Sequence, residues 1–116
     1  MSEETLFTKI INGDIPADIV YEDEHCFAIK DIAPKAPTHL LVIPKKPIPR
    51  LVDAIPEDKA LLGHLMLAVG KIAKKVGVDE AFRVIINNGE GVGQTVFHLH
   101  LHILANKVFS EDSLGF

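Results

Sequence analysis

The sequence contains little cysteine, little positive charge and no long hydrophobic run. Cys26 is its only cysteine, so no disulfide can form within the chain, and we expect a reducing compartment. The net charge of −4 gives no basic field for nucleic acid, although a local site can still hold a small anion. No stretch approaches the roughly 20 apolar residues that span a bilayer, and residues 1–4 lack the features of a signal peptide. These absences favour a cytoplasmic protein with no nucleic-acid or membrane partner.

The remaining composition is that of a globular protein with one core. Hydrophobic residues make up 47 % of the 116 residues, and no repeat, low-complexity tract or linker marks a boundary. We therefore expect a single domain over residues 1–116. Cys26 lies in the apolar run of residues 26–29, where a free cysteine packs as a small hydrophobic side chain.

The apolar pattern predicts two helices and five strands. The long helix runs from about Pro56 to Val76, because apolar residues recur there every three or four positions and Gly77 ends the pattern. A nearly continuous apolar run over 39–43 is typical of a central strand buried on both faces. The other elements are a short helix over 5–11 and strands over 19–22, 26–30, 82–86 and 96–104. Strands on both sides of one long helix indicate an α+β fold in two layers, with a mostly antiparallel five-stranded sheet.

Three histidines alternate with apolar residues near the end of the chain. On a strand, His98, His100 and His102 share one face, with their side chains about 6.5 Å apart. The opposite face, which we expect to lie in the core, carries Phe97, Leu99, Leu101 and Ile103. A merely solvated strand face would mix threonine, lysine, glutamate and serine, so three of the six histidines in one short segment indicate a functional site.

Two chemistries fit these histidines. Three imidazoles and a water can hold a catalytic Zn²⁺, or one imidazole can be a nucleophile that the others orient. The preceding residues favour the second, because three glycines between Gly89 and Gly93 would let backbone N–H groups approach an anion, and Gln94 and Thr95 add side-chain donors. Glu90 is the only carboxylate close in sequence to support a metal ligand. We therefore expect a phosphate-binding enzyme with no metal and no cofactor.

The segment His98-Leu99-His100-Leu101-His102-Ile103-Leu104 matches the His-φ-His-φ-His-φ-φ signature (φ, apolar) of the histidine triad (HIT) superfamily. The blocks over 31–46 and 82–96 resemble its Hint-like branch of nucleoside phosphoramidases, and the similarity runs from about Thr5 to Leu104. Three places depart from that branch: Thr95 stands where serine is usual, Ala105-Asn106 replaces Gly-Gly, and Pro47 replaces a common histidine.

The resemblance implies a role for each site residue. His100 would attack the α-phosphorus and form a covalent nucleotidyl-histidine that water hydrolyses, while His102 and the glycine loop stabilise the phosphoryl oxygens. The implied supporting catalytic residues are His98, His39 and Thr95. Asp31 would hold the ribose hydroxyls. Without the resemblance, its place before Pro34 indicates a turn residue. The implied base contacts are Phe7, Ile10, Ile29 and Ile32, and the implied phosphate contacts are Asn87, Gly93 and Gln94. His25 and His64 fall outside the motif, as surface or interface residues.

The resemblance also implies the reaction and the assembly. We expect a hydrolase that splits the P–N bond of purine nucleoside phosphoramidates and releases the AMP- or GMP-type monophosphate. The alternatives are a dinucleoside polyphosphate hydrolase of the same superfamily, a nucleotide-binding regulatory module with little turnover, and a zinc-binding protein. We expect a homodimer that uses the long helix, because Gly63 and Gly70 weaken that helix unless another backbone comes close.

Overall fold

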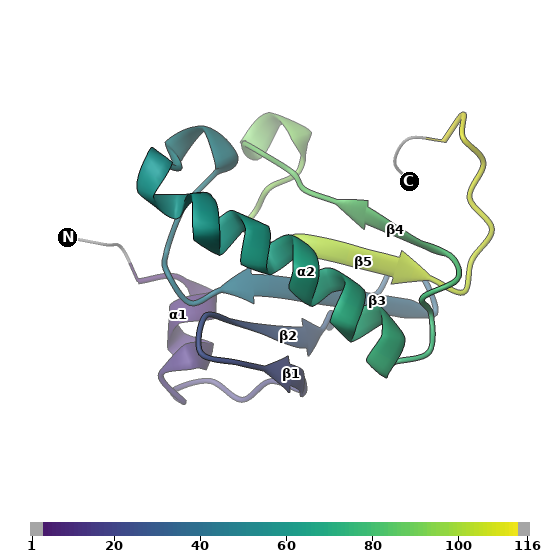
Figure 1. Ribbon diagram of the computed structural model, residues 1–116, viewed down its shortest axis with the longest axis horizontal. Coiled ribbons are helices and arrows are strands. Elements are labelled where there is room, and N and C mark those ends of the chain that lie inside the picture. Colours follow the sequence, from purple (N-terminus) through teal and green to yellow (C-terminus); the bar gives the residue numbers. More distant parts are fainter. Residues whose placement is uncertain (1–3, 114–116) are drawn as a thin grey trace.

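The computed structural model describes residues 4–113, and its centre is one antiparallel sheet (Figure 1). The strands lie in the order β1-β2-β3-β5-β4. Their bounds are Ile19–Glu22 for β1, Cys26–Lys30 for β2, Thr38–Pro44 for β3, Phe82–Ile85 for β4 and Leu101–Ala105 for β5. The sheet and one long helix confirm the predicted α+β fold, and β3 is the central strand, as its continuous apolar run indicates.

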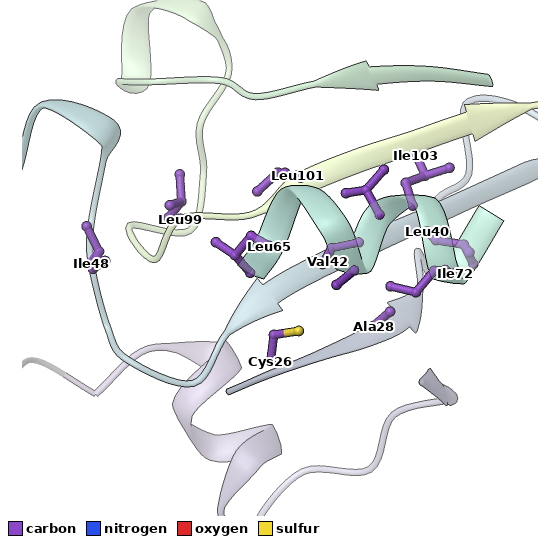
Figure 2. Close-up of a cluster of buried hydrophobic side chains, with 12 residues drawn as sticks. Cys26, Ala28, Leu40, Val42, Ile48, Leu65, Ile72, Leu99, Leu101 and Ile103 are labelled. Carbon is purple, nitrogen blue, oxygen red and sulfur yellow. The ribbon is translucent and has the colours of Figure 1, made fainter. Parts of the chain in front are cut away.

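Helix α2 (Lys59–Lys75) lies across one face of the sheet. Figure 2 shows the core between them, where Leu65 and Ile72 of the helix meet Val42 and Leu101 of the sheet. Cys26 belongs to this core and is fully buried, which confirms the burial expected from its apolar neighbours. The helix starts three residues later than predicted, because Pro56–Asp58 form a 3₁₀ turn in front of it.

Helix α1 (Leu6–Ile11) packs on the opposite face. Thr5 caps its N-terminus, and Phe7 and Ile10 contact the side chains of Leu41 and Ile43. Residues at alternate positions of β2 and β3 therefore enter two different cores, which explains why these strands are apolar throughout. Within the described residues, no helix is both long enough and apolar enough to cross a bilayer.

The predicted strand over 96–104 is wrong in its first half. Regular pairing begins only at Leu101, because the Leu99 N–H donates to the Ile48 carbonyl oxygen (2.6 Å) rather than to a neighbouring strand. Phe97 is 44 % exposed and lies outside the core that the alternation predicts for it. Leu99, Leu101 and Ile103 do enter the core beneath α2, so the alternation of faces holds from residue 98 onward.

The apolar face predicted for the long helix is buried only in part. Leu65, Val69, Ile72 and Ala73 are buried, and Leu61, Leu62 and Val76 are half-buried against the core. Met66 is 56 % exposed because it lies at the edge of the helix-sheet contact. Part of the apolar surface of the helix therefore stays exposed in the single chain.

Candidate active site

His100 presents an unprotonated nitrogen to a cavity. Its Nδ1 lies 2.8 Å from the His98 carbonyl oxygen, which can only accept, so Nδ1 carries the proton and Nε2 carries a lone pair. The ring is buried and packs edge-on against Phe7, with 5.0 Å between ring centroids. This tautomer is the one that a nucleophilic imidazole requires.

His102 is oriented by a chain of hydrogen bonds that starts at the backbone. The Lys35 N–H donates to Nδ1 of His39 (2.9 Å), so the proton of the His39 ring lies on Nε2. That Nε2 lies 2.9 Å from Nδ1 of His102 and 3.3 Å from Oδ2 of Asp31. His102 therefore accepts at Nδ1 and carries its own proton on Nε2, where a hydrogen-bond donor can face a ligand.

His98 supports the site from the protein interior, behind the cavity. Its Nε2 donates to the Pro44 carbonyl oxygen (2.6 Å), and its Nδ1 lies 3.2 Å from the hydroxyl of Thr5, the cap of α1. The ring is completely buried and does not line the cavity. The backbone carbonyl of His98 accepts from His100, and the His98 ring bonds to Pro44 of β3 and to Thr5 at the start of α1. His98 therefore links the position of His100 to both elements.

The imidazoles of the site are held neutral. Burial lowers the pKa of His98 and of His100 below its usual value, and a hydrogen bond to a carbonyl partly offsets this in each. Burial, His100 and His39 together lower the pKa of His102 to about 4. Burial also lowers the pKa of His39, although the Asp31 charge acts in the opposite direction. A neutral ring keeps the lone pair that nucleophilic attack needs.

These shifts predict the acid limb of the pH profile. Since protonation of His100 removes its lone pair and its folded-state pKa is lowered, kcat/KM should persist as pH falls below 6.5 and decline only in more acidic solution. A profile of kcat/KM from pH 4 to pH 8, with circular dichroism at each pH as the control for folding, measures this. An acid limb with its midpoint at or above pH 6.5 would contradict the neutral-imidazole arrangement.

A cavity of about 500 Å³ lies in front of His100 and His102, a size usual for small-molecule sites. Seven other residues with predicted roles also line it: Phe7, Ile10, Ile29, Asp31, Ile32, Gly93 and Thr95. Ile32 is 98 % exposed, so it forms the rim rather than the floor. Asp31 accepts from the Ala33 N–H at Oδ1 (2.8 Å), as a turn residue does, and it also lines the cavity.

Several wall residues were not predicted from the sequence. They are Leu6, Ile15, Pro16, Ala17, Asp18, Lys30, Leu41 and Val96. Most are apolar side chains without chemistry of their own, and the segment 15–18 reaches the site only through the path of the chain after α1. Such residues are identified only by the folded structure, in which they line the same cavity as His100 and His102.

The glycine loop differs from the predicted phosphate cradle. The N–H groups of Gly93 and Gln94 donate within the loop, to the carbonyl oxygens of Glu90 (3.0 Å) and Gly89 (3.1 Å). The Gln94 side chain is buried and donates to the carbonyls of Pro49 and Val96, so it holds the loop in place instead of facing a ligand. From this loop, Gly93 and Thr95 reach the cavity, while Asn87 is half-buried and does not line it.

Asp31, His39 and His102 have ligand atoms within 4.8 Å of one another, as a metal site requires. Two of these nitrogens, however, share the hydrogen bond between the His39 and His102 rings. An ion could bind there only by breaking that bond, and the orientation of His102 would be lost with it.

Comparison with known proteins agrees with this geometry. The family model described as the HIT domain matches residues 12–108. An uncharacterised HIT-like protein of Synechocystis is 59 % identical over 110 residues, covering 95 % of this chain and 96 % of the relative.

Two solved structures share the fold and the chain length. A HIT family hydrolase from Legionella pneumophila has a TM-score of 0.89 and 41 % identity, covering 93 % of this chain and 97 % of that chain. A histidine triad nucleotide-binding protein from Candida albicans has a TM-score of 0.77 and 30 % identity, covering 97 % of this chain and 90 % of that chain. The HIT fold, the three histidines and the family match over most of the sequence show that this chain belongs to the HIT family.

Proposed function

We propose that this chain is a single-domain, cytoplasmic hydrolase that splits the P–N bond of purine nucleoside phosphoramidates. The observation that carries the proposal is the His100 tautomer: Nδ1 is bound to the His98 carbonyl, and Nε2 is left for the cavity. The names of two relatives, a hydrolase and a nucleotide-binding protein, support the reaction class and the ligand class.

In the first step, Nε2 of His100 attacks the α-phosphorus and forms an N–P bond as the bond to the leaving amine breaks. His102 donates from Nε2 to a phosphoryl oxygen, where negative charge develops, and the His39 ring keeps that donor in place. Thr95 also lines the cavity, and in this proposal its hydroxyl contacts the leaving group.

In the second step, water attacks the same phosphorus and the bond to His100 breaks. The amine takes a proton from solvent as it leaves in the first step, and the water that attacks in the second step returns one. Over both steps, water therefore supplies the hydroxyl that stays on phosphorus and the proton that the amine retains. His100 returns to the neutral ring with its lone pair on Nε2, because its proton stays on Nδ1, which donates to the His98 carbonyl oxygen throughout.

The apolar part of the cavity suits a purine base. Phe7, Ile10 and Ile29 contribute apolar side chains to the lining of the cavity, and Asp31 lines the same cavity. A carboxylate at this place can accept hydrogen bonds from the two ribose hydroxyls.

The direct test compares substrate classes. We expect purified protein to release monophosphate from adenosine phosphoramidate much faster than from a diadenosine polyphosphate. The reverse order would favour a dinucleoside polyphosphate hydrolase, and tight nucleotide binding with no turnover of either would favour a regulatory module.

Exhaustive chelation is expected to leave the rate unchanged. Imidazole and hydroxyl donors face the cavity, so we propose that the charge on the phosphoryl group is stabilised without a metal or other cofactor. The measurement is kcat/KM after dialysis against a chelator, with metal analysis of the dialysed sample as the control. A loss that Zn²⁺ or Mg²⁺ restores would refute the metal-free mechanism.

We also propose that the chain forms a homodimer through α2 and the edge strand β4. An apolar groove of about 310 Å³ lies beside the helix, and its lining includes Leu62, Gly63 and Met66. Leu67 of the same helix is 71 % exposed, and β4 pairs with a neighbour on one side only. A second copy would cover this surface and pair the free edge.

Gly63→Ala is expected to weaken that dimer. A Cβ at this position meets no atom within 4 Å in one chain, so in a monomer alanine should stabilise the helix by about 1 kcal/mol. Against a closely packed partner, the methyl group would instead raise the dissociation constant. Light scattering across a dilution series measures this, with circular dichroism as the control for helix content. A wild-type mass of 12.7 kDa at micromolar concentration would refute the dimer.

A further inference from the structure

A second cluster of titratable side chains lies away from the cavity, where the turn between β1 and β2 meets α2. Asp23 from the turn, Cys26 from the start of β2 and His64 from the helix have ligand atoms within 4.8 Å of one another. The proposed reaction uses none of them. His64 was expected to be a surface or interface residue, but it is half-buried and bonded to Asp23.

The Asp23 carboxylate is held so that one oxygen faces the other two groups. Its Oδ1 accepts from the N–H groups of His25 (2.8 Å) and Cys26 (2.9 Å), which fixes the plane of the carboxylate. Its Oδ2 lies 2.7 Å from Nε2 of His64 and 3.6 Å from Sγ of Cys26. The hydroxyl of Tyr21 donates to the same Oδ2 (2.7 Å), so an ion would take the lone pair of that oxygen that now accepts from His64, and two bonds to the ion would replace that hydrogen bond.

We propose that Asp23 Oδ2, Cys26 Sγ and His64 Nε2 form a Zn²⁺ site that joins the β1–β2 turn to helix α2. A thiolate, an imidazole and a carboxylate are ligands that zinc accepts together, and a water fills the fourth position. Ligand atoms around tetrahedral zinc lie roughly 3.5 Å apart. The two separations from Asp23 Oδ2, 2.7 Å and 3.6 Å, are close to this value, and all three ligand atoms lie within 4.8 Å of one another.

The charges balance in this arrangement. Binding displaces the proton of the Cys26 thiol to solvent and moves the His64 ring proton from Nε2 to Nδ1, so both sulfur and nitrogen offer lone pairs. The thiolate and the Asp23 carboxylate then neutralise the two positive charges of the ion. The His25 ring, edge-on to the His64 ring with 5.0 Å between centroids, helps to keep His64 turned toward Asp23.

The buried thiol makes this site dependent on pH. Burial first, and then the Asp23 charge, raise the pKa of Cys26 to about 12, whereas Lys45 and Lys71 act in the opposite direction. Since the ion must displace that proton, its affinity should increase as the solution becomes more alkaline. Lys45 is itself paired with Glu22 (2.8 Å), which limits its repulsion of a cation.

Cobalt is the appropriate probe, because Co²⁺ bound to a thiolate absorbs in the near ultraviolet and Cys26 is the only thiol in the chain. We expect a chelator-treated, untagged protein to develop this absorption at one equivalent of Co²⁺ and to lose it when Zn²⁺ is added. Cys26→Ser should abolish the absorption, and His64→Gln should weaken Co²⁺ binding at least tenfold.

His39→Gln is the matched control, because it disrupts the other group of three possible ligands and should leave the absorption intact. Wild-type protein that shows no thiolate absorption with excess Co²⁺ at pH 8 would overturn the proposal, and the cluster would then be a hydrogen-bonded link only. Absorption that His64→Gln leaves unchanged would overturn it as well. Neither result bears on the proposed hydrolysis, which uses other residues.

Discussion

His100→Ala is expected to lower kcat on a nucleoside phosphoramidate by on the order of 10³-fold or more, because no other residue among 4–113 that lines the cavity offers an unprotonated ring nitrogen to phosphorus. The His102 ring is engaged at Nδ1 and protonated at Nε2, and the His98 ring is buried behind the site. Steady-state kinetics with adenosine phosphoramidate measures the loss.

The fold and the nucleotide affinity of this variant should remain close to wild type. The side chain projects into the cavity, whereas Leu99 and Leu101 on either side of it fill the core beneath α2. Circular dichroism and a nucleotide titration are the controls. Retention of a tenth or more of the wild-type rate would rule out a covalent route through His100.

His102→Ala is expected to have the second largest effect, a loss of about 10²- to 10³-fold in kcat, the size usual for removing one donor to a developing negative charge. The loss should appear in kcat more than in KM, because the charge on the phosphoryl oxygens increases in the transition state. The comparison is made under the same conditions as for His100→Ala.

His102→Gln is the matched control, since its amide retains an N–H near the same place and should recover part of the rate. If alanine and glutamine variants both act at the wild-type rate, His102 is not the donor. If glutamine is no better than alanine, the orientation that the His39 ring imposes matters more than the presence of a donor.

The architecture follows from local patterns in the sequence. The continuous apolar run of β3 predicts a strand with a core on each face, and α1 and α2 supply those two cores. The spacing of His98, His100 and His102 predicts a shared face, which holds although regular strand pairing begins only at Leu101. Alternation by two is a property of extended backbone, and it does not need a paired neighbour.

The finer roles depend on contacts between distant segments, which a local pattern does not contain. The proton positions on His39 and His102 depend on the Lys35 backbone N–H, which lies far along the chain from the triad. Gln94 is expected beside phosphate from its place in the sequence, yet its side chain bonds to Pro49, 45 residues away. Phe97 fits the alternation of the sequence, but it lies before β5 begins and its side chain is exposed.

The stereochemical course at phosphorus tests the central claim most directly. Hydrolysis of a nucleoside phosphoramidate made chiral at phosphorus, in isotopically labelled water, shows whether one or two displacements occur. Attack by His100 followed by attack by water inverts phosphorus twice, so we predict net retention of configuration. Net inversion would show that water attacks the substrate in a single step, and it would contradict a covalent nucleotidyl-His100 intermediate.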